Sequence, residues 1–185
     1  MKALTFKRYG KSPEIGFSDV PCPALKADEM LVQVHAASVN PIDNMIPTGI
    51  FKAVVKFQLP ATLGSDLAGV VVEVGNRVTR FKPGDAVFAN IFDQDTGAIA
   101  ESAVVPETAA ALKPANLDFV QAASIPMVGL TSWQALKERI GLRAGQKMFI
   151  PAGSGGIGTF AIQLAKLLGA KVGTTTSTGN VDLVR

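Results

Sequence analysis

The stretch of sequence that decides the fold is Ile150-Pro151-Ala152-Gly153-Ser154-Gly155-Gly156-Ile157-Gly158-Thr159-Phe160-Ala161. It places a Gly-x-Gly-x-x-Gly pattern at Gly153, Gly155 and Gly158. An apolar strand is predicted immediately before it, over Lys147–Ile150, and a helix after it, over Ile157–Leu168. A glycine-rich turn between a strand and a helix lets the backbone approach a pyrophosphate and directs the helix N-terminus at that anion. The segment therefore predicts a dinucleotide-binding turn.

Length and composition indicate a folded globular chain. Its 185 residues are 48% hydrophobic and 18% charged, which is apolar enough to bury a core. A net charge of +3 without a run of Lys and Arg argues against a nucleic-acid partner. Cys22 is the only cysteine, which excludes an intrachain disulfide and a multi-cysteine metal site.

The sequence also bears on location. Lys7, Arg8 and Lys11 interrupt the N-terminal segment, which argues against a secretory signal. No window is apolar for long enough to span a bilayer. We therefore expect a cytoplasmic protein with no membrane partner.

Two kinds of pattern divide the chain near Pro114. Before it, short strands separated by Gly and Pro turn signals indicate a small barrel or sandwich. These strands are expected at Lys2–Lys7, Glu29–Ala37, Ala68–Val74, Ala86–Ala89 and Ala98–Val105. After it, Asp118 predicts a helix start, Pro126–Lys137 a longer helix, and Lys171–Thr176 a second strand beyond the glycine turn. The expected fold class is β plus α/β.

Four stretches of the chain carry a resemblance to a known family. They are Leu31–Asp43, Gly64–Gly75 together with Phe81–Val87, Ala123–Leu136, and the glycine turn. In order and spacing they resemble the zinc-independent quinone oxidoreductase branch of the medium-chain dehydrogenase/reductase superfamily. The resemblance implies a GroES-like β-barrel catalytic domain over residues 1–117 and part of an NADP-binding Rossmann domain over residues 118–185. Because members of the family are considerably longer, it also implies a truncated Rossmann sheet and a barrel domain without its C-terminal return.

The resemblance implies hydride transfer from NADPH to a small apolar carbonyl or quinone substrate, without a metal. Zinc-dependent relatives carry Cys where Asn40 stands and His where Ser65 stands, and His35 is interpreted as an ordinary strand histidine. By family match, Asn40 and Asp43 lie at the edge of the substrate pocket. Asn40 offers an amide donor to a developing enolate or quinol oxygen, while Asp43 fixes a loop. The structural alternative is an Asx-type turn at Asn40-Pro41.

The resemblance also assigns residues to the cofactor. Thr131 approaches the nicotinamide in the family, although its hydroxyl could instead bond back to the preceding helical turn. The glycine turn contributes Ala152, Gly153, Ser154, Gly155, Gly156, Ile157 and Gly158.

The residues that follow the second strand beyond the glycine turn distinguish NADPH from NADH. NAD-specific sites carry an acid there, whereas this sequence has none before Asp182. Thr176, Ser177 and Asn180 are therefore expected to donate hydrogen bonds to a 2′-phosphate, which predicts NADPH over NADH. The alternative is that these polar residues merely populate a loop.

Two functions stay open at this point. The first is an NADPH-dependent reductase of quinones, enones or similar electron-poor substrates. The second is a catalytically incompetent truncated homologue or fragment, acting at most as a nucleotide-binding or dimerising module. Since an incomplete parallel sheet exposes strand edges and apolar surface, we also expect a homodimer.

Overall fold

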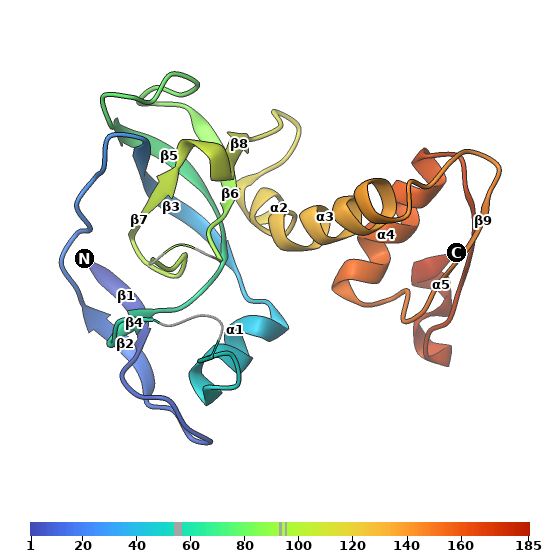
Figure 1. Cartoon of the computed structure of the whole chain (residues 1–185), viewed down its shortest axis with the longest axis horizontal. Helices are drawn as coiled ribbons and strands as arrows, with labels where there is room; N and C mark the ends of the chain where they lie inside the picture. The colour runs from blue at the N-terminus through green and yellow to red at the C-terminus, as the bar shows by residue number, and fades with distance from the viewer. Residues whose placement is uncertain (54–56, 93, 95) are drawn as a thin grey trace. The chain divides into compact units, whose positions relative to one another are not determined.

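The computed structural model describes residues 1–53, 57–92, 94 and 96–185. These residues form two compact units, Met1–Pro126 and Met127–Arg185. In Figure 1 the first unit runs from blue to yellow and consists mainly of strands, while the second runs from yellow to red and contains a strand–helix–strand unit. This is the β plus α/β organisation that the sequence predicts.

The first unit is built from short antiparallel strands (Figure 1). Its strands are β1 (Lys2–Phe6), β2 (Ile15–Asp19), β3 (Glu29–Ser38), β4 (Ala61–Thr62), β5 (Asp66–Val74), β6 (Ala86–Asn90), β7 (Ser102–Pro106) and β8 (Ala110–Leu112). Its helical segments are α1 (Pro41–Met45), the 3₁₀ turns η1 (Ile46–Thr48) and η2 (Glu107–Ala109), and α2 (Phe119–Ala123). In the described residues, one sheet has the order β7-β3-β5-β6-β8 and a smaller one the order β2-β1-β4.

One strand prediction in this unit is wrong in its extent. The expected strand Ala98–Val105 divides, and β7 begins only at Ser102 and pairs with β3. The earlier residues bond elsewhere, because the Ile99 N–H donates to the Leu63 carbonyl at 2.9 Å. Strand β2 was not predicted, since most of its residues are exposed and it lacks a buried alternation.

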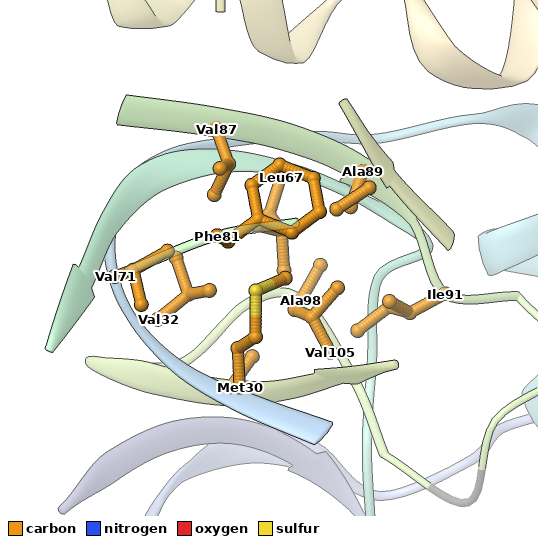
Figure 2. Packing of buried hydrophobic residues seen from close by; sticks show 12 residues of the cluster. Met30, Val32, Leu67, Val71, Phe81, Val87, Ala89, Ile91, Ala98 and Val105 are labelled. Atoms are coloured by element: carbon orange, nitrogen blue, oxygen red, sulfur yellow. The ribbon is translucent and has the colours of Figure 1, made fainter. Parts of the chain in front are cut away.

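The core of the first unit lies on one face of the larger sheet. In β3, Met30 and Val32 are buried while Gln33 is exposed, as the two-residue period of a strand requires. Figure 2 shows the side chains of Met30, Leu67 and Phe81 directed toward one another within this buried cluster. Aliphatic residues of β3, β5, β6 and β7 surround them, so the sheet and its core are one packed body.

Helix α2 packs on the same sheet. The carboxylate of Asp118 accepts a backbone N–H at 2.7 Å and caps the helix, which confirms the predicted start. Ala122 packs with Ala68 of β5, and the Phe119 ring stacks on the exposed His35 with centroids 4.4 Å apart. The sequence-based boundary at residue 117 assigns this helix to the second domain, whereas its contacts place it in the first unit.

The second unit contains the predicted strand, glycine turn, helix and second strand. Its elements are α3 (Pro126–Trp133), the π-helical segment η3 (Gln134–Arg139), β9 (Lys147–Ile150), α4 (Gly156–Leu167), β10 (Lys171–Thr174), the 3₁₀ turn η4 (Thr178–Asn180) and α5 (Val181–Val184). Strands β9 and β10 are parallel, with Lys147 opposite Lys171 and Ile150 opposite Thr174. The second strand is shorter than predicted because Thr175 turns to the glycine loop, where its carbonyl accepts the Gly153 N–H at 2.8 Å.

Helix α4 packs on this pair of strands through one apolar stripe. Gly158, Ala161, Ile162 and Ala165 are buried at the helical spacing and contribute to the core of the unit. The helix ends as predicted at Gly169, whose φ of 81° is readily available only to glycine. The start and the end of the helix are therefore both determined locally.

Leu67 provides a test of the barrel core. The substitution Leu67→Ala should destabilise the first unit by about 2–5 kcal/mol, because this fully buried side chain leaves a cavity at the centre of the cluster in Figure 2. Urea unfolding followed by circular dichroism measures the change. Leu112→Ala, at a position 60% exposed in the same unit, is the matched control and should have little effect. Equal losses in the two variants would contradict the assigned core.

Candidate functional site

Three strands of the larger sheet bring polar residues together at one end. Strand β3 ends at Ser38, β5 begins at Asp66, and β6 ends at Asn90. The antiparallel register pairs Asp66 with Ser38 on one side and with Asn90 on the other. Directly paired residues place their side chains on the same face of a sheet. The fold therefore sets a hydroxyl, a carboxylate and an amide side by side.

The carboxylate of Asp66 is the centre of a hydrogen-bond network. Its Oδ2 accepts from Asn40 Nδ2 at 3.0 Å and from Ser38 Oγ at 3.2 Å. Its Oδ1 accepts from Asn90 Nδ2 at 2.7 Å. Asp66 is fully buried, so these donors replace the water that the carboxylate gives up on folding.

A second buried carboxylate, Asp43, lies in helix α1 next to this network. It accepts the backbone N–H of Asn40 at 2.7 Å and the hydroxyl of Ser65 at 2.5 Å. Asp43 and Ser65 are 3% and 1% exposed. Pro41 at the first position of the helix presets its backbone for this start. The structure thus brings together the two residues, Asn40 and Asp43, that the sequence nominates as catalytic.

Asn40 connects the two carboxylates and is the more accessible partner. Its backbone N–H binds Asp43 and its side-chain amide binds Asp66, whereas its own side chain is only half-buried. Two carboxylates thus hold Asn40, one through its backbone N–H and one through its side-chain amide. Asn40 is also the N-cap of α1 and forms a capping box with Asp43, so the local turn and the bond to Asp66 are both present.

Phenylalanines near this network belong to the core. Phe57 and Phe92 line a cavity of about 10 Å³ beside Ser65, which is the size of one water molecule. Phe51 packs in the same cluster, and Phe88 packs with helix α2. These rings support the site from within the protein.

In the second unit, close packing explains the first and third glycines of the turn. A Cβ at Gly158 would lie 2.4 Å from the Ala152 carbonyl oxygen, so helix α4 can approach the strand end only with glycine there. A Cβ at Gly153 would lie 2.2 Å from Thr174 Oγ1. Ala152 itself has a φ of 53°, a strained value for a residue other than glycine. The turn is therefore tightly constrained by its own chain.

Gly155 differs from these two glycines. Its φ of −77° is accessible to any residue, and a Cβ there would meet one protein atom, the Ala152 carbonyl oxygen at 3.3 Å. It caps helix α4 and is exposed. Packing within the chain gives little reason for a glycine at this position.

Polar residues after β10 gather at the glycine turn. The hydroxyl of Thr176 donates to Ser154 Oγ at 2.7 Å, and Asn180 Nδ2 donates to the same atom at 3.3 Å. Ser177 is exposed beside them and precedes η4. Two of the three residues predicted to bind a 2′-phosphate are thus held at the turn through Ser154.

The other predicted cofactor residues lie on exposed or half-buried positions of this unit. Thr131 is half-buried on α3, and Ile157 and Gly156 begin α4, with Gly156 close to Val128 of α3. Ser132, next to Thr131, is 1% exposed, and its hydroxyl has no hydrogen-bond partner in the described part of the chain.

The described residues contain neither a cluster of metal-ligating side chains nor a membrane-spanning helix. Within the ranges that the structure describes, no group of three or more His, Cys, Asp or Glu side chains is arranged to hold a metal ion. In the same residues, no helix has both the length and the apolar character needed to cross a bilayer.

Comparison with known proteins identifies the architecture. Residues 26–115 match the alcohol dehydrogenase GroES-like domain. The chain is 39% identical to a 2-methylene-furan-3-one reductase of Solanum lycopersicum, and the match spans all of this chain and 50% of the reductase. It is 40% identical to an NADPH-dependent alkenal/one oxidoreductase, chloroplastic, of Arabidopsis thaliana, with the same coverage.

A solved structure agrees with these matches. The quinone oxidoreductase from Coxiella burnetii superimposes with a TM-score of 0.88 at 37% identity, covering 100% of this chain and 59% of that one. The chain belongs to the medium-chain dehydrogenase/reductase superfamily.

As a member of this superfamily, the chain combines a GroES-like domain with part of a Rossmann-type fold, as its sequence predicts. It spans about half the length of the curated relatives it matches. Those relatives are named as a reductase and an oxidoreductase.

Sequence reasoning did not nominate Asp66, Ser38 or Asn90 for the site. Asp66 and Asn90 are far apart in the chain, and their pairing follows only from the sheet register. One signal was available, since an acidic residue at the start of the buried run Asp66–Val74 needs hydrogen-bond donors nearby.

The steric role of Gly158 can be tested directly. Gly158→Ala should destabilise the second unit by about 1–3 kcal/mol, because the added methyl group overlaps the Ala152 carbonyl. Gly179→Ala is the matched control, since its Cβ would have no heavy atom within 4 Å. Thermal unfolding followed by the fluorescence of Trp133, which lies in the same unit, measures both variants. A Gly158→Ala variant as stable as the control would refute this packing.

Proposed function

We propose that the protein is an NADPH-dependent oxidoreductase that transfers hydride to a quinone, an enone or a similar electron-poor substrate without zinc. The observation that carries the proposal is Gly155, an exposed glycine at the helix N-cap whose Cβ would be less crowded than one at Gly153 or Gly158. A ligand whose phosphates contact the backbone explains a missing side chain at that position. Similarity to an NADPH-dependent alkenal/one oxidoreductase supports the cofactor and the enone class, and similarity to a quinone oxidoreductase supports the quinones.

In this proposal the turn residues Ala152–Gly158 hold the pyrophosphate at the start of α4. Thr176, Ser177 and Asn180 hold the 2′-phosphate of NADPH, with Ser154 tying two of them to the turn. Hydroxyl and amide donors suit a phosphate, and no acidic residue lies between the end of β10 and Asp182 to repel it. Thr131 is the proposed contact to the nicotinamide.

When bound, NADPH supplies the hydride. The residues of this chain then bind and polarise the acceptor. Asn40 Nδ2 donates a hydrogen bond to the oxygen that gains negative charge, since Nδ2 carries two hydrogens. Asp43 fixes the Asn40 backbone and the Ser65 hydroxyl, so the donor is held in place before the substrate arrives.

Independence from zinc rests on the donor chemistry of two positions. Asn40 presents an amide N–H₂ group to Asp66, and Ser65 donates its hydroxyl hydrogen to Asp43. Both groups act as donors to carboxylates rather than as metal ligands, which are thiolates, imidazoles or carboxylates in zinc enzymes.

We propose the same division of labour between the two parts as the sequence suggests. Residues 1–117, with helix α2 packed on them, form the catalytic barrel domain, and the rest of residues 118–185 forms part of the NADP-binding domain. A homodimer and a cytoplasmic location complete the proposal. Apolar side chains such as Phe149, which is 63% exposed, are the surface that a second copy would cover.

The alternative function is a nucleotide-binding or dimerising module without turnover.

The role of Gly155 predicts a loss of nucleotide binding that exceeds the loss of stability. Gly155→Ala should weaken NADPH affinity about tenfold or more, because the methyl group occupies the space of a phosphate contact. It should cost less stability than Gly158→Ala, because its Cβ would lie 3.3 Å rather than 2.4 Å from the Ala152 carbonyl oxygen. Gly16→Ala, whose Cβ would contact nothing within 4 Å, is the control. Isothermal titration measures the affinity of both variants.

The same titration compares NADPH with NADH in the wild-type protein. Wild-type NADPH affinity should be about 10–100-fold higher than NADH affinity, and equal affinities would reject the 2′-phosphate site.

Turnover separates the two candidate functions. NADPH oxidation, followed at the nicotinamide absorbance, should accelerate with 1,4-benzoquinone or but-3-en-2-one and should persist after treatment with a zinc chelator. Binding of NADPH without oxidation by any acceptor in such a panel would favour the module without turnover. Loss of activity on chelation would refute zinc independence.

A further inference from the structure

Asp66 is a buried charge that the proposed mechanism leaves without a task. Its side chain is fully buried, so it cannot touch a substrate. A buried carboxylate is tolerated only when hydrogen-bond donors surround it, and removing such donors is strongly destabilising. In the part of the chain that the structure describes, donors reach it from the end of β3, the start of α1 and the end of β6.

The hydrogen bonds at Asp66 determine which way the Asn40 amide faces. Ser38 and Asn90 both donate to this carboxylate, as expected for a group that accepts and does not donate, so the group 3.0 Å from its Oδ2 is the N–H₂ end of Asn40. An amide facing two neutral groups could turn over, but one facing a carboxylate cannot without placing two acceptors together.

The same geometry leaves one hydrogen of Asn40 for a ligand. Ser38 Oγ lies 3.4 Å from Asn40 Nδ2 and 3.2 Å from Asp66 Oδ2. These two acceptors are close enough together to share a single N–H of the amide. The other N–H of Nδ2 is then available on the half-buried side chain.

Asn90 prevents the carboxylate from rotating away. It holds Asp66 Oδ1 at 2.7 Å from the opposite strand, and its own Oδ1 accepts the Phe92 N–H at 3.3 Å. The carboxylate is thus held between β6 and the β3–α1 junction, and its Oδ2 stays directed at Asn40.

We infer that Asp66 is a positioning residue, which fixes the donor orientation of Asn40 for the substrate oxygen. The inference rests on the proposed function, in which Asn40 donates to that oxygen. Asp66 acts through Asn40 alone and makes no contact with substrate or cofactor.

Kinetics test the inference in the protein with NADPH and 1,4-benzoquinone. Asp66→Asn keeps the shape of the side chain but replaces one carboxylate oxygen with an N–H₂ group. This group faces the side-chain amides of Asn40 and Asn90, so the Asn40 donor is no longer fixed. The value of kcat should fall about 10–100-fold, while KM changes by less than about threefold. Leu67→Ala, the adjacent core residue in β5, controls for lost stability and should keep kcat within about threefold at a temperature where it is folded.

A double variant separates positioning from a general structural role. If Asp66 acts through Asn40, Asn40→Ala/Asp66→Asn should have the same kcat as Asn40→Ala, because the second change removes nothing further. Multiplying losses in the double variant would overturn the inference.

Nuclear magnetic resonance gives a readout that does not depend on turnover. The Asn40 side-chain N–H₂ pair, assigned by its absence in Asn40→Ala, should show one slowly exchanging proton and two well-separated shifts in the wild-type protein. In Asp66→Asn these features should collapse toward those of a free side chain. A wild-type Asn40 amide that already exchanges like a free one would overturn the inference, even if Asp66→Asn does not fold. Absence of turnover with an ordered Asn40 amide would reject the proposed function alone.

Discussion

The first unit depends on keeping the carboxylate of Asp66 satisfied away from water. Fully buried charges are expensive unless donors replace their hydration, and here two amides and a hydroxyl do so. Because those donors come from β3, β6 and the start of α1, the same requirement fixes the strand ends and the position of the helix. Asn40 and Asp43 occupy that helix start, so the constraint that stabilises the fold also orients the candidate site.

The second unit depends on a steric constraint instead. Helix α4 and the end of β9 approach so closely that a side chain at Gly158 would collide with the Ala152 carbonyl. This contact sets the helix N-terminus directly after the strand, and the strained Ala152 and the bond from Gly153 to Thr175 stabilise the turn. Two of its glycines are explained by the chain itself. The remaining one, Gly155, is the position where we propose a ligand contact.

The sequence predicted local features well because local chemistry determines them. Asp118 caps α2 and Gly169 ends α4 as expected, since a cap depends on a few neighbouring residues. Strand extents were less predictable. Residues 98–101 bond to Leu63 and to β1 rather than continuing β7, and no local pattern encodes that choice. The pairing of Asp66 with Asn90 was missed for the same reason, because it arises from the register of β5 and β6.

The sequence by itself determined the class of each part of this protein. Strand periodicity, turn residues and the glycine pattern specify a β-rich unit followed by a strand–turn–helix–strand unit, because each depends on residues close together in the chain. The tertiary structure decided which polar groups meet. Only the sheet register brings Ser38, Asp66 and Asn90 together, and only the packing of β10 beside β9 brings Thr176 and Asn180 to Ser154. Those contacts join residues distant in sequence, and their energy comes from burying and satisfying polar groups in one folded arrangement.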